Sequence, residues 1–291
     1  MKSLKGIFSA LLIAFDKDGN IDEKGIRETV RHNIDKMKVD GLYVGGSTGE
    51  NFMLPTEVKK RIFDIAMDEC KGEIAMIAQV GSLDLNEAVE LGKYATDLGY
   101  DALSAVTPFY YKFTFEEIKN YYNTITNATN NKMILYSISL LTGVSMTVPQ
   151  FAELFENENI IGVKFTEGNF FLMERLRHAF PDKLLYSGFD EMLLSATVLN
   201  VDGAIGSTYN VNGLNAKKIF TLAKEGKIDE ARELQRKAND MIEAVIGNGL
   251  FQTLKELLKC QGVSAGFCKE PLGKLSPEKV ERAKEIYKNY L

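Results

Sequence analysis

Short apolar runs alternate with longer amphipathic stretches along most of this 291-residue chain. Several runs are continuously apolar instead of alternating between apolar and polar residues, which is typical of parallel strands that are covered on both faces. Runs of this length, bounded by turn-forming residues, indicate strands. We predict strands at residues 7–15, 41–44, 74–80, 102–107, 133–138, 160–164, 184–187 and 203–206.

The stretches between these runs carry the start signals of helices. Thr114 and Glu117 have the spacing of a capping box, in which the two side chains satisfy two backbone N–H groups. Asp84 precedes another helical pattern. Strands that alternate with helices are joined by crossovers and are therefore parallel. Within about residues 1–225, the repeated strand–helix unit predicts a (β/α)8 TIM barrel instead of an open doubly wound sheet.

The remaining residues, about 226–291, form a C-terminal tail. Apolar residues recur at helical spacing in 228–245, 251–258 and 277–290, so we expect roughly three helices there. No internal stretch rich in proline, serine or charge marks a linker. We therefore expect one domain, a barrel with a C-terminal helical extension.

The charge pattern narrows the class of partner. The formal net charge is −5, and no run of lysine or arginine forms a basic patch. This argues against nucleic acid and against a membrane surface as partners, and it favours a small-molecule substrate. The amino terminus lacks a cleavage-site pattern, and no run approaches the ~18 apolar residues of a membrane helix. We expect a cytoplasmic protein.

Cysteine and histidine offer little for metal or disulfide chemistry. Cys70, Cys260 and Cys268 form an odd set without CxxC spacing, and the two histidines, His32 and His178, lie far from any cysteine motif. A disulfide framework or a zinc site is not expected. Proton transfer must rely on tyrosine, lysine or carboxylates.

Lys164 follows the apolar residues 160–163, where a buried strand would deliver its amine into a pocket. A lysine in that place is a candidate Schiff-base nucleophile, although a lysine after a short strand is more often solvated. Tyr136 ends the preceding strand. Because barrel active sites lie at the C-terminal ends of the strands, we expect the phenol and the amine to lie close together. The phenol would relay protons; the alternative is an ordinary core aromatic.

Polar residues also follow other predicted strands. Ser47 and Thr48 lie in the glycine-rich turn 45–50, whose N–H groups and hydroxyls suit a carboxylate, although a plain β-turn has the same composition. Asp190 and Glu191 would accept hydrogen bonds from a sugar-like substrate, or would complement the dipole at a helix N-terminus.

The loop 107–111 after the fourth strand is aromatic and contains Tyr110. Its rings would line the site or form a contact between subunits. Taken together, the segments 46–50, 107–111 and 162–164, with Tyr136, resemble the pyruvate-dependent Schiff-base aldolases, the family that includes N-acetylneuraminate lyases and dihydrodipicolinate synthases. The resemblance covers nearly the whole chain.

This resemblance implies a (β/α)8 barrel that assembles as a homotetramer. Lys164 would form the Schiff base with the pyruvate carbonyl, and Ser47 and Thr48 would hold the pyruvate carboxylate. Tyr136 would relay the proton of carbon–carbon bond cleavage or formation, and Tyr110 resembles a tyrosine that members contribute near or across a subunit contact. A protonated imine is an electron sink, so neither a metal nor a bound cofactor is required.

Within the family, the rim of the predicted barrel is most similar to that of sialic acid lyases. The synthases have an arginine shortly after the strand-5 tyrosine, whereas residues 137–143 contain leucines and no arginine. In the lyases the residues that match Gly188, Asp190, Glu191 and Ser207 bind the glycerol-like tail of the sugar acid, and the residue that matches Thr166 contacts substrate.

The resemblance therefore implies reversible cleavage of N-acetylneuraminate to N-acetylmannosamine and pyruvate. A related aldolase of 2-keto-3-deoxy sugar acids, a dihydrodipicolinate synthase and a non-catalytic barrel that binds sugar acids remain as alternatives. One residue departs from the family pattern: Ser139 stands where members usually have proline. Loss of the ring frees the loop, so we expect the orientation of Tyr136 and the rate to be affected.

Overall fold

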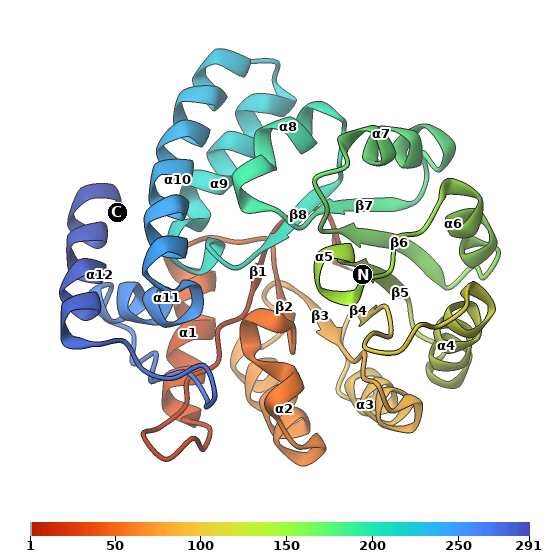
Figure 1. Ribbon diagram of the computed structural model, residues 1–291, viewed down its shortest axis with the longest axis horizontal. Coiled ribbons are helices and arrows are strands. Elements are labelled where there is room, and N and C mark those ends of the chain that lie inside the picture. Colours follow the sequence, from red (N-terminus) through yellow and green to blue (C-terminus); the bar gives the residue numbers. More distant parts are fainter. Residues whose placement is uncertain (1) are drawn as a thin grey trace.

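The computed structural model describes residues 2–291 and shows a barrel of strands surrounded by helices (Figure 1). In this range β1 to β8 pair side by side in chain order, and β1 also pairs with β8, which closes the barrel. All neighbouring strands are parallel, so the predicted TIM barrel is confirmed. The strands are β1 (Gly6–Ala10), β2 (Gly41–Val44), β3 (Ala75–Gln79), β4 (Ala102–Val106), β5 (Met133–Ser137), β6 (Ile160–Phe165), β7 (Leu184–Ser187) and β8 (Gly203–Gly206).

Helices follow each strand and cover the outside of the barrel (Figure 1). They are α1 (Glu23–Asp35), α2 (Thr56–Cys70), α3 (Leu85–Asp97), α4 (Phe115–Thr129), α6 (Val148–Phe155), α7 (Phe170–Ala179), α8 (Leu193–Val198) and α9 (Tyr209–Lys224). Shorter turns follow three of the strands: η1 (Ser47–Gly49) and η2 (Asn51–Met53) after β2, α5 (Ser139–Thr142) after β5 and η3 (Asp190–Met192) after β7.

The predicted helix starts are present. The Thr114 hydroxyl accepts a hydrogen bond from the Glu117 N–H, and the Glu117 carboxylate accepts one from the Thr114 N–H, which completes the capping box of α4. The Asp84 side chain accepts from the N–H of Asn86 at the start of α3. Each bond satisfies a backbone donor that has no partner within its own helix.

Several predicted strand boundaries were wrong, most clearly at the amino terminus. The run 7–15 is buried throughout, but β1 ends at Ala10, and beyond it the chain leaves the sheet. The Leu12 N–H then donates to the Asn210 side chain instead of to a neighbouring strand. Runs 74–80, 102–107 and 133–138 were also too long, whereas 160–164 was one residue short at Phe165. Continuous hydrophobicity reports burial and does not mark where strand pairing ends.

The barrel interior is filled by side chains that the strands direct inward. Phe8, Tyr43, Tyr136 and Tyr186 are buried there together with aliphatic residues. The rings of Phe8 and Tyr186 pack edge to face, as do those of Tyr43 and Tyr136. These aromatic rings therefore form part of the packed core of the barrel.

The C-terminal tail packs against one side of the barrel. Its helices α10 (Ile228–Asn248), α11 (Leu250–Cys260) and α12 (Pro277–Tyr290) lie near α9 and α1 (Figure 1). Their apolar faces share a buried cluster with Leu12 and Val211. The tail therefore contributes to the same folded body as the barrel.

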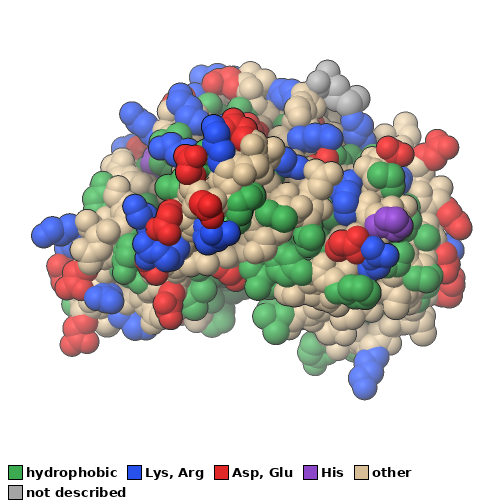
Figure 2. Space-filling model, turned by 90° about the horizontal axis from the view of Figure 1, so that it is seen from above, with side chains coloured by type: hydrophobic (Ala, Val, Ile, Leu, Met, Phe, Trp, Pro, Cys, Tyr) green, Lys and Arg blue, Asp and Glu red, His purple; other side chains and the backbone are tan. Residues whose placement is uncertain are grey.

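The surface carries charges of both signs. On the face shown in Figure 2, Lys and Arg side chains are interspersed with Asp and Glu instead of gathering into a patch of one sign. Among the residues that the structure describes, no helix has the length and apolar character needed to span a membrane.

Candidate active site

Lys164 and Tyr136 meet inside the C-terminal rim of the barrel. They occupy paired positions on β6 and β5, and the Lys164 Nζ lies 3.5 Å from the centre of the Tyr136 ring. The same nitrogen lies 5.2 Å from the centre of the Tyr43 ring on β2. Lys164 is only 5% exposed. The amine is thus held against two aromatic rings at the end of a buried strand. A molecule that enters the barrel at this rim can reach it.

The amine opens into a cavity of about 230 Å³. Nine of the residues singled out from the sequence line it: Ser47, Thr48, Tyr136, Lys164, Thr166, Gly188, Asp190, Glu191 and Ser207. They come from the ends of five strands or from the segments that follow them, and the barrel brings the C-terminal ends of these strands together. A volume of this order suits a small molecule that is largely enclosed.

The turn after β2 presents Ser47 and Thr48 to the cavity. Gly45 precedes it with φ +80°, and a side chain there would lie 2.9 Å from the Gln79 carbonyl oxygen, so the turn passes close to β3. The Thr48 Oγ1 lies 2.6 Å from the Ser207 Oγ, which ties the turn to the end of β8. Hydroxyls from the ends of β2 and β8, the two strands that flank β1, thereby lie side by side in the cavity.

Asp190 lies at the start of η3 and is buried. Its Oδ2 accepts hydrogen bonds from the Thr208 N–H and the Thr208 hydroxyl. Burial raises the pKa of Asp190 to about 6, and the bonds from Thr208 oppose that rise. A carboxyl group with this pKa changes its protonation state near pH 6. Glu191 lies beside it on the cavity wall.

Thr166 and Gly188 form a narrow part of the cavity. The Thr166 Oγ1 is buried and has no hydrogen-bond partner in the described part of the chain. A Cβ at Gly188 would lie 1.8 Å from that oxygen, and a Cβ at Gly206 would lie 1.7 Å from the Asp190 Oδ1. An unpaired buried hydroxyl is costly, so the Thr166 oxygen is a natural contact for a bound polar group.

Tyr110 does not line the cavity of its own chain. It is 82% exposed, has φ +75°, and packs its ring edge to face against the neighbouring ring of Tyr111. That Tyr110 lines the site or forms a contact between subunits therefore stays a prediction.

Ser139 is the first residue of α5. The first position of a helix is one that proline favours, because its N–H has no partner within the helix. The preceding residue, Ile138, has φ −145° and ψ 76°, outside the α region that a following proline disfavours. The backbone at this position therefore suits serine and proline alike.

The sequence reasoning missed one residue beside the catalytic pair and one group of residues that line the cavity. Tyr43 was counted only as part of an apolar strand, but its ring packs against Tyr136, and its hydroxyl donates to the Ser104 Oγ at 3.0 Å. Burial raises the pKa of Tyr43 well above its ordinary value, so the phenol stays protonated. The other group comes from the C-terminal helices, whose residues Ile242, Ile246, Leu250 and Phe251 form an apolar wall.

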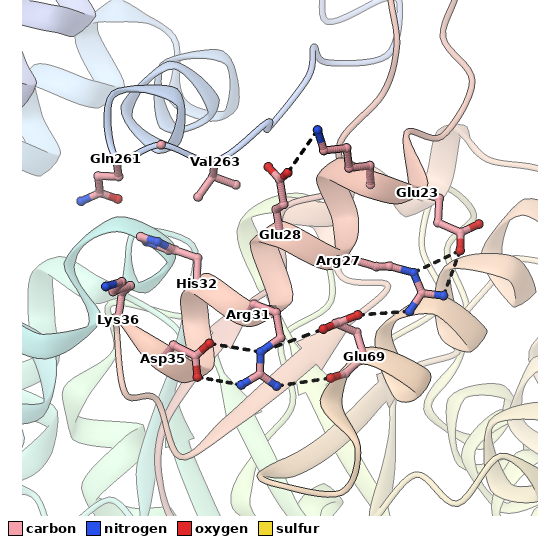
Figure 3. Close-up of a pocket in the computed structure, with 12 residues that line it drawn as sticks. Glu23, Arg27, Glu28, Arg31, His32, Asp35, Lys36, Glu69, Gln261 and Val263 are labelled. Carbon is pink, nitrogen blue, oxygen red and sulfur yellow. Dashed lines mark hydrogen bonds and ion pairs between the residues drawn. The ribbon is translucent and has the colours of Figure 1, made fainter.

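A second hollow, of about 610 Å³, lies on the outside of the barrel between α1, α2 and the turn after α11 (Figure 3). Its charged side chains bind one another. Arg27 pairs with Glu23 and Glu69, and Arg31 pairs with Asp35, so the cations join α1 to its neighbour α2 (Figure 3). Among residues 2–291, no group of three or more potential metal ligands is present here or elsewhere.

Comparison with known proteins places this geometry in a family. Residues 3–290 match the dihydrodipicolinate synthetase family. The chain is 65% identical over 288 residues to the N-acetylneuraminate lyase of Fusobacterium nucleatum, covering 99% of each chain. A crystal structure of the F. nucleatum lyase complexed with pyruvate superposes with a TM-score of 0.96 at 64% identity, over 99% of this chain and 97% of that one. The crystal structure of CdNal from Clostridium difficile in complex with mannosamine gives 0.99 at 64% identity, over 100% of both chains. This chain belongs to the dihydrodipicolinate synthetase family.

Proposed function

We propose that the protein is an N-acetylneuraminate lyase, which cleaves N-acetylneuraminate reversibly to N-acetylmannosamine and pyruvate. The observation that carries the proposal is the buried Lys164 amine, 3.5 Å from the Tyr136 ring centre, at the base of a cavity with a polar rim. Relatives of about 65% identity that bear this name agree with it. The protein is a carbon–carbon lyase of the Schiff-base class.

The reaction uses the lysine as an electron sink. The Lys164 nitrogen adds to the C2 carbonyl of the open-chain sugar acid, and loss of water gives a protonated imine. The bond between C3 and C4 then breaks, and its electron pair passes through the new C2–C3 double bond to the imine nitrogen. Tyr136 relays the proton that leaves the C4 hydroxyl, which becomes the aldehyde of N-acetylmannosamine. Protonation of the enamine at C3 and hydrolysis release pyruvate and free Lys164.

Different groups of cavity residues bind different parts of the substrate. Ser47 and Thr48 bind the carboxylate next to C2, since the turn offers both hydroxyls and backbone N–H groups. The hydroxyl-bearing tail contacts Thr166, Gly188, Asp190, Glu191 and Ser207, which follow β6, β7 and β8. Because Oδ2 of Asp190 already accepts from Thr208, we assign the substrate contact to its Oδ1.

We also propose a cytoplasmic homotetramer with one domain per chain. The exposed rings of Tyr110 and Tyr111 support a subunit contact, because large apolar side chains grouped at a surface mark interaction sites. Cysteines 70, 260 and 268 are all free, as is usual in a reducing compartment. The cluster that joins the tail to Leu12 and Val211 supports a single domain.

The proposal is tested by borohydride reduction in the presence of N-acetylneuraminate, followed by intact and peptide mass measurement. We expect a reduced pyruvate or sugar-acid adduct on the peptide that contains Lys164. A folded protein that is labelled by neither N-acetylneuraminate nor pyruvate would refute the imine mechanism. Comparable turnover of N-acetylneuraminate and a 2-keto-3-deoxy sugar acid would instead assign a broader aldolase.

A further inference from the structure

A buried ion pair joins the turn after β2 to the C-terminal helices. The Lys255 Nζ on α11 lies 2.6 Å from the Glu50 Oε1, and the side chains are 1% and 0% exposed. Burying two charges costs several kcal/mol per ion, and apolar residues often serve stability as well as a buried pair does. The pair therefore calls for a reason other than stability alone.

Glu50 directly follows the residues that face the substrate carboxylate. It is the residue after η1, and its N–H donates to the Ser47 carbonyl at 3.0 Å. Its backbone is left-handed, with φ 60° and ψ 26°, a conformation that costs about 1 kcal/mol for a residue other than glycine. A strained residue persists only where its surroundings hold it. In Glu50, contacts of the side chain hold the residue in this conformation.

Both carboxylate oxygens of Glu50 are fixed by the C-terminal part of the chain. Oε1 accepts from Lys255, and Oε2 accepts from the N–H of Lys269 at 2.6 Å. The Lys255 ammonium in turn donates to the Phe267 carbonyl at 2.6 Å and lies 4.9 Å from the centre of the Phe15 ring. These contacts leave the carboxylate a single position, between α11 and the segment 267–269.

The same helix faces the cavity. Phe251 lies one turn before Lys255 on α11 and lines the substrate cavity together with Leu250. The C-terminal helices thus touch the site twice, once through an apolar wall and once through the anchored turn. Displacement of α11 would move Glu50 and, through the backbone of η1, the hydroxyls of Ser47 and Thr48.

We propose that Glu50 and Lys255 are positioning residues, which act through the turn they anchor to set the affinity for the carboxylate of pyruvate and of the sugar acid. The inference rests on the proposed function, in which Ser47 and Thr48 bind that carboxylate. Neither Glu50 nor Lys255 touches the reacting atoms. A turn released from its anchor loses the aligned hydrogen bonds to the carboxylate while Lys164 and Tyr136 stay in place.

The test compares Glu50→Gln, Lys255→Met and the double variant. For each, borohydride labelling of Lys164 is measured against pyruvate concentration, and KM for N-acetylmannosamine is measured in the condensation direction. We expect the half-saturating pyruvate concentration to rise about tenfold, the effect of losing one good hydrogen bond to a carboxylate, with KM for N-acetylmannosamine near the wild-type value. Arg177→Met, which breaks the ion pair with Asp202 at the other end of the barrel, is the matched control.

The double variant separates positioning from stability. Removal of both charges leaves no unpaired buried ion, so the thermal stability should recover toward wild type. The half-saturating pyruvate concentration should stay raised, because the ion pair that holds the turn is still missing. The proposal would be overturned if the double variant recovered both the thermal stability and the half-saturating pyruvate concentration of the wild type. It would also be overturned if the folded single variants kept the wild-type half-saturating concentration.

If Glu50→Gln does not fold, Glu50→Asp keeps the charge and shortens the reach by one methylene. A raised half-saturating pyruvate concentration in that variant supports the proposal, and a wild-type concentration refutes it. Wild-type protein is labelled first. Absence of any label on wild-type Lys164 would overturn the proposed function and this inference together, whereas a labelled wild type with unaffected variants would overturn the inference alone.

Discussion

The contact between Gly188 and Thr166 gives a sharp test of the cavity geometry. In Gly188→Ala the new methyl group would lie 1.8 Å from the Thr166 Oγ1, whereas ordinary contacts begin at 3.4 Å. One of the two groups must therefore move by about 1.6 Å to reach an ordinary contact. Overpacking of this kind costs about 1–3 kcal/mol, so we expect the protein to remain folded.

The displaced groups line the substrate cavity, and a misplacement of about 1 Å can reduce a rate about 100-fold. We therefore expect kcat/KM for N-acetylneuraminate to fall about 100-fold in Gly188→Ala. Pyruvate release is followed by a coupled lactate dehydrogenase assay, and folding is followed by thermal denaturation.

Gly168→Ala is the matched control, because a Cβ at Gly168 meets nothing within 4 Å and its φ is not in the left-handed region. Its kcat/KM should stay near the wild-type value. Wild-type kcat/KM in a folded Gly188→Ala variant would refute the reasoning, since it would mean that substrate does not use this part of the wall.

The remaining predictions concern the chemistry and the loop. Lys164→Arg should fold and lose all turnover, because a guanidinium stays protonated and forms no imine; appreciable turnover would exclude the mechanism. Tyr136→Phe should lower kcat far more than it weakens pyruvate binding, and equal losses would make the phenol a binding group. Asp190, with its pKa raised to about 6, gains a proton as the pH falls through 6, so kcat/KM for N-acetylneuraminate should decline below that pH. Asp190→Asn should remove this decline from the pH profile; its persistence would assign it to another group. Ser139→Pro should raise the free energy of unfolding by about 0.5 kcal/mol, measured by chemical denaturation, and a loss would show that the α5 backbone is unsuited to proline.

The barrel could be predicted from the sequence because its buried strands are visible as continuous apolar runs. Apolar runs separated by helix starts such as Thr114 and Glu117 leave few alternatives to a parallel (β/α)8 arrangement. The placement of Lys164 beside Tyr136 followed from the same topology, since neighbouring parallel strands align their C-terminal ends. Both predictions depend only on the order of strands and helices along the chain.

The parts that were missed depend on contacts between distant residues. The apolar wall that includes Phe251 reads as an ordinary helix face, because periodicity shows that a face is buried and not what it is buried against. Lys255 offered a stronger signal, as a charge between Leu254 and Leu258 on the apolar face of its helix. Its partner, Glu50, lies 205 residues away, so no local pattern could have joined them.

The pairing of β1 with β8 has a consequence for biosynthesis. The partner of Gly6 is Gly203, so roughly 200 residues must emerge from the ribosome before the first strand finds its second neighbour. At 5–20 residues per second this takes about 10–40 seconds, during which one apolar edge of the sheet stays open to aggregation. Lys255 emerges later still. A nascent chain can thus close its barrel before Lys255 can form its ion pair with Glu50 and fix the turn after β2.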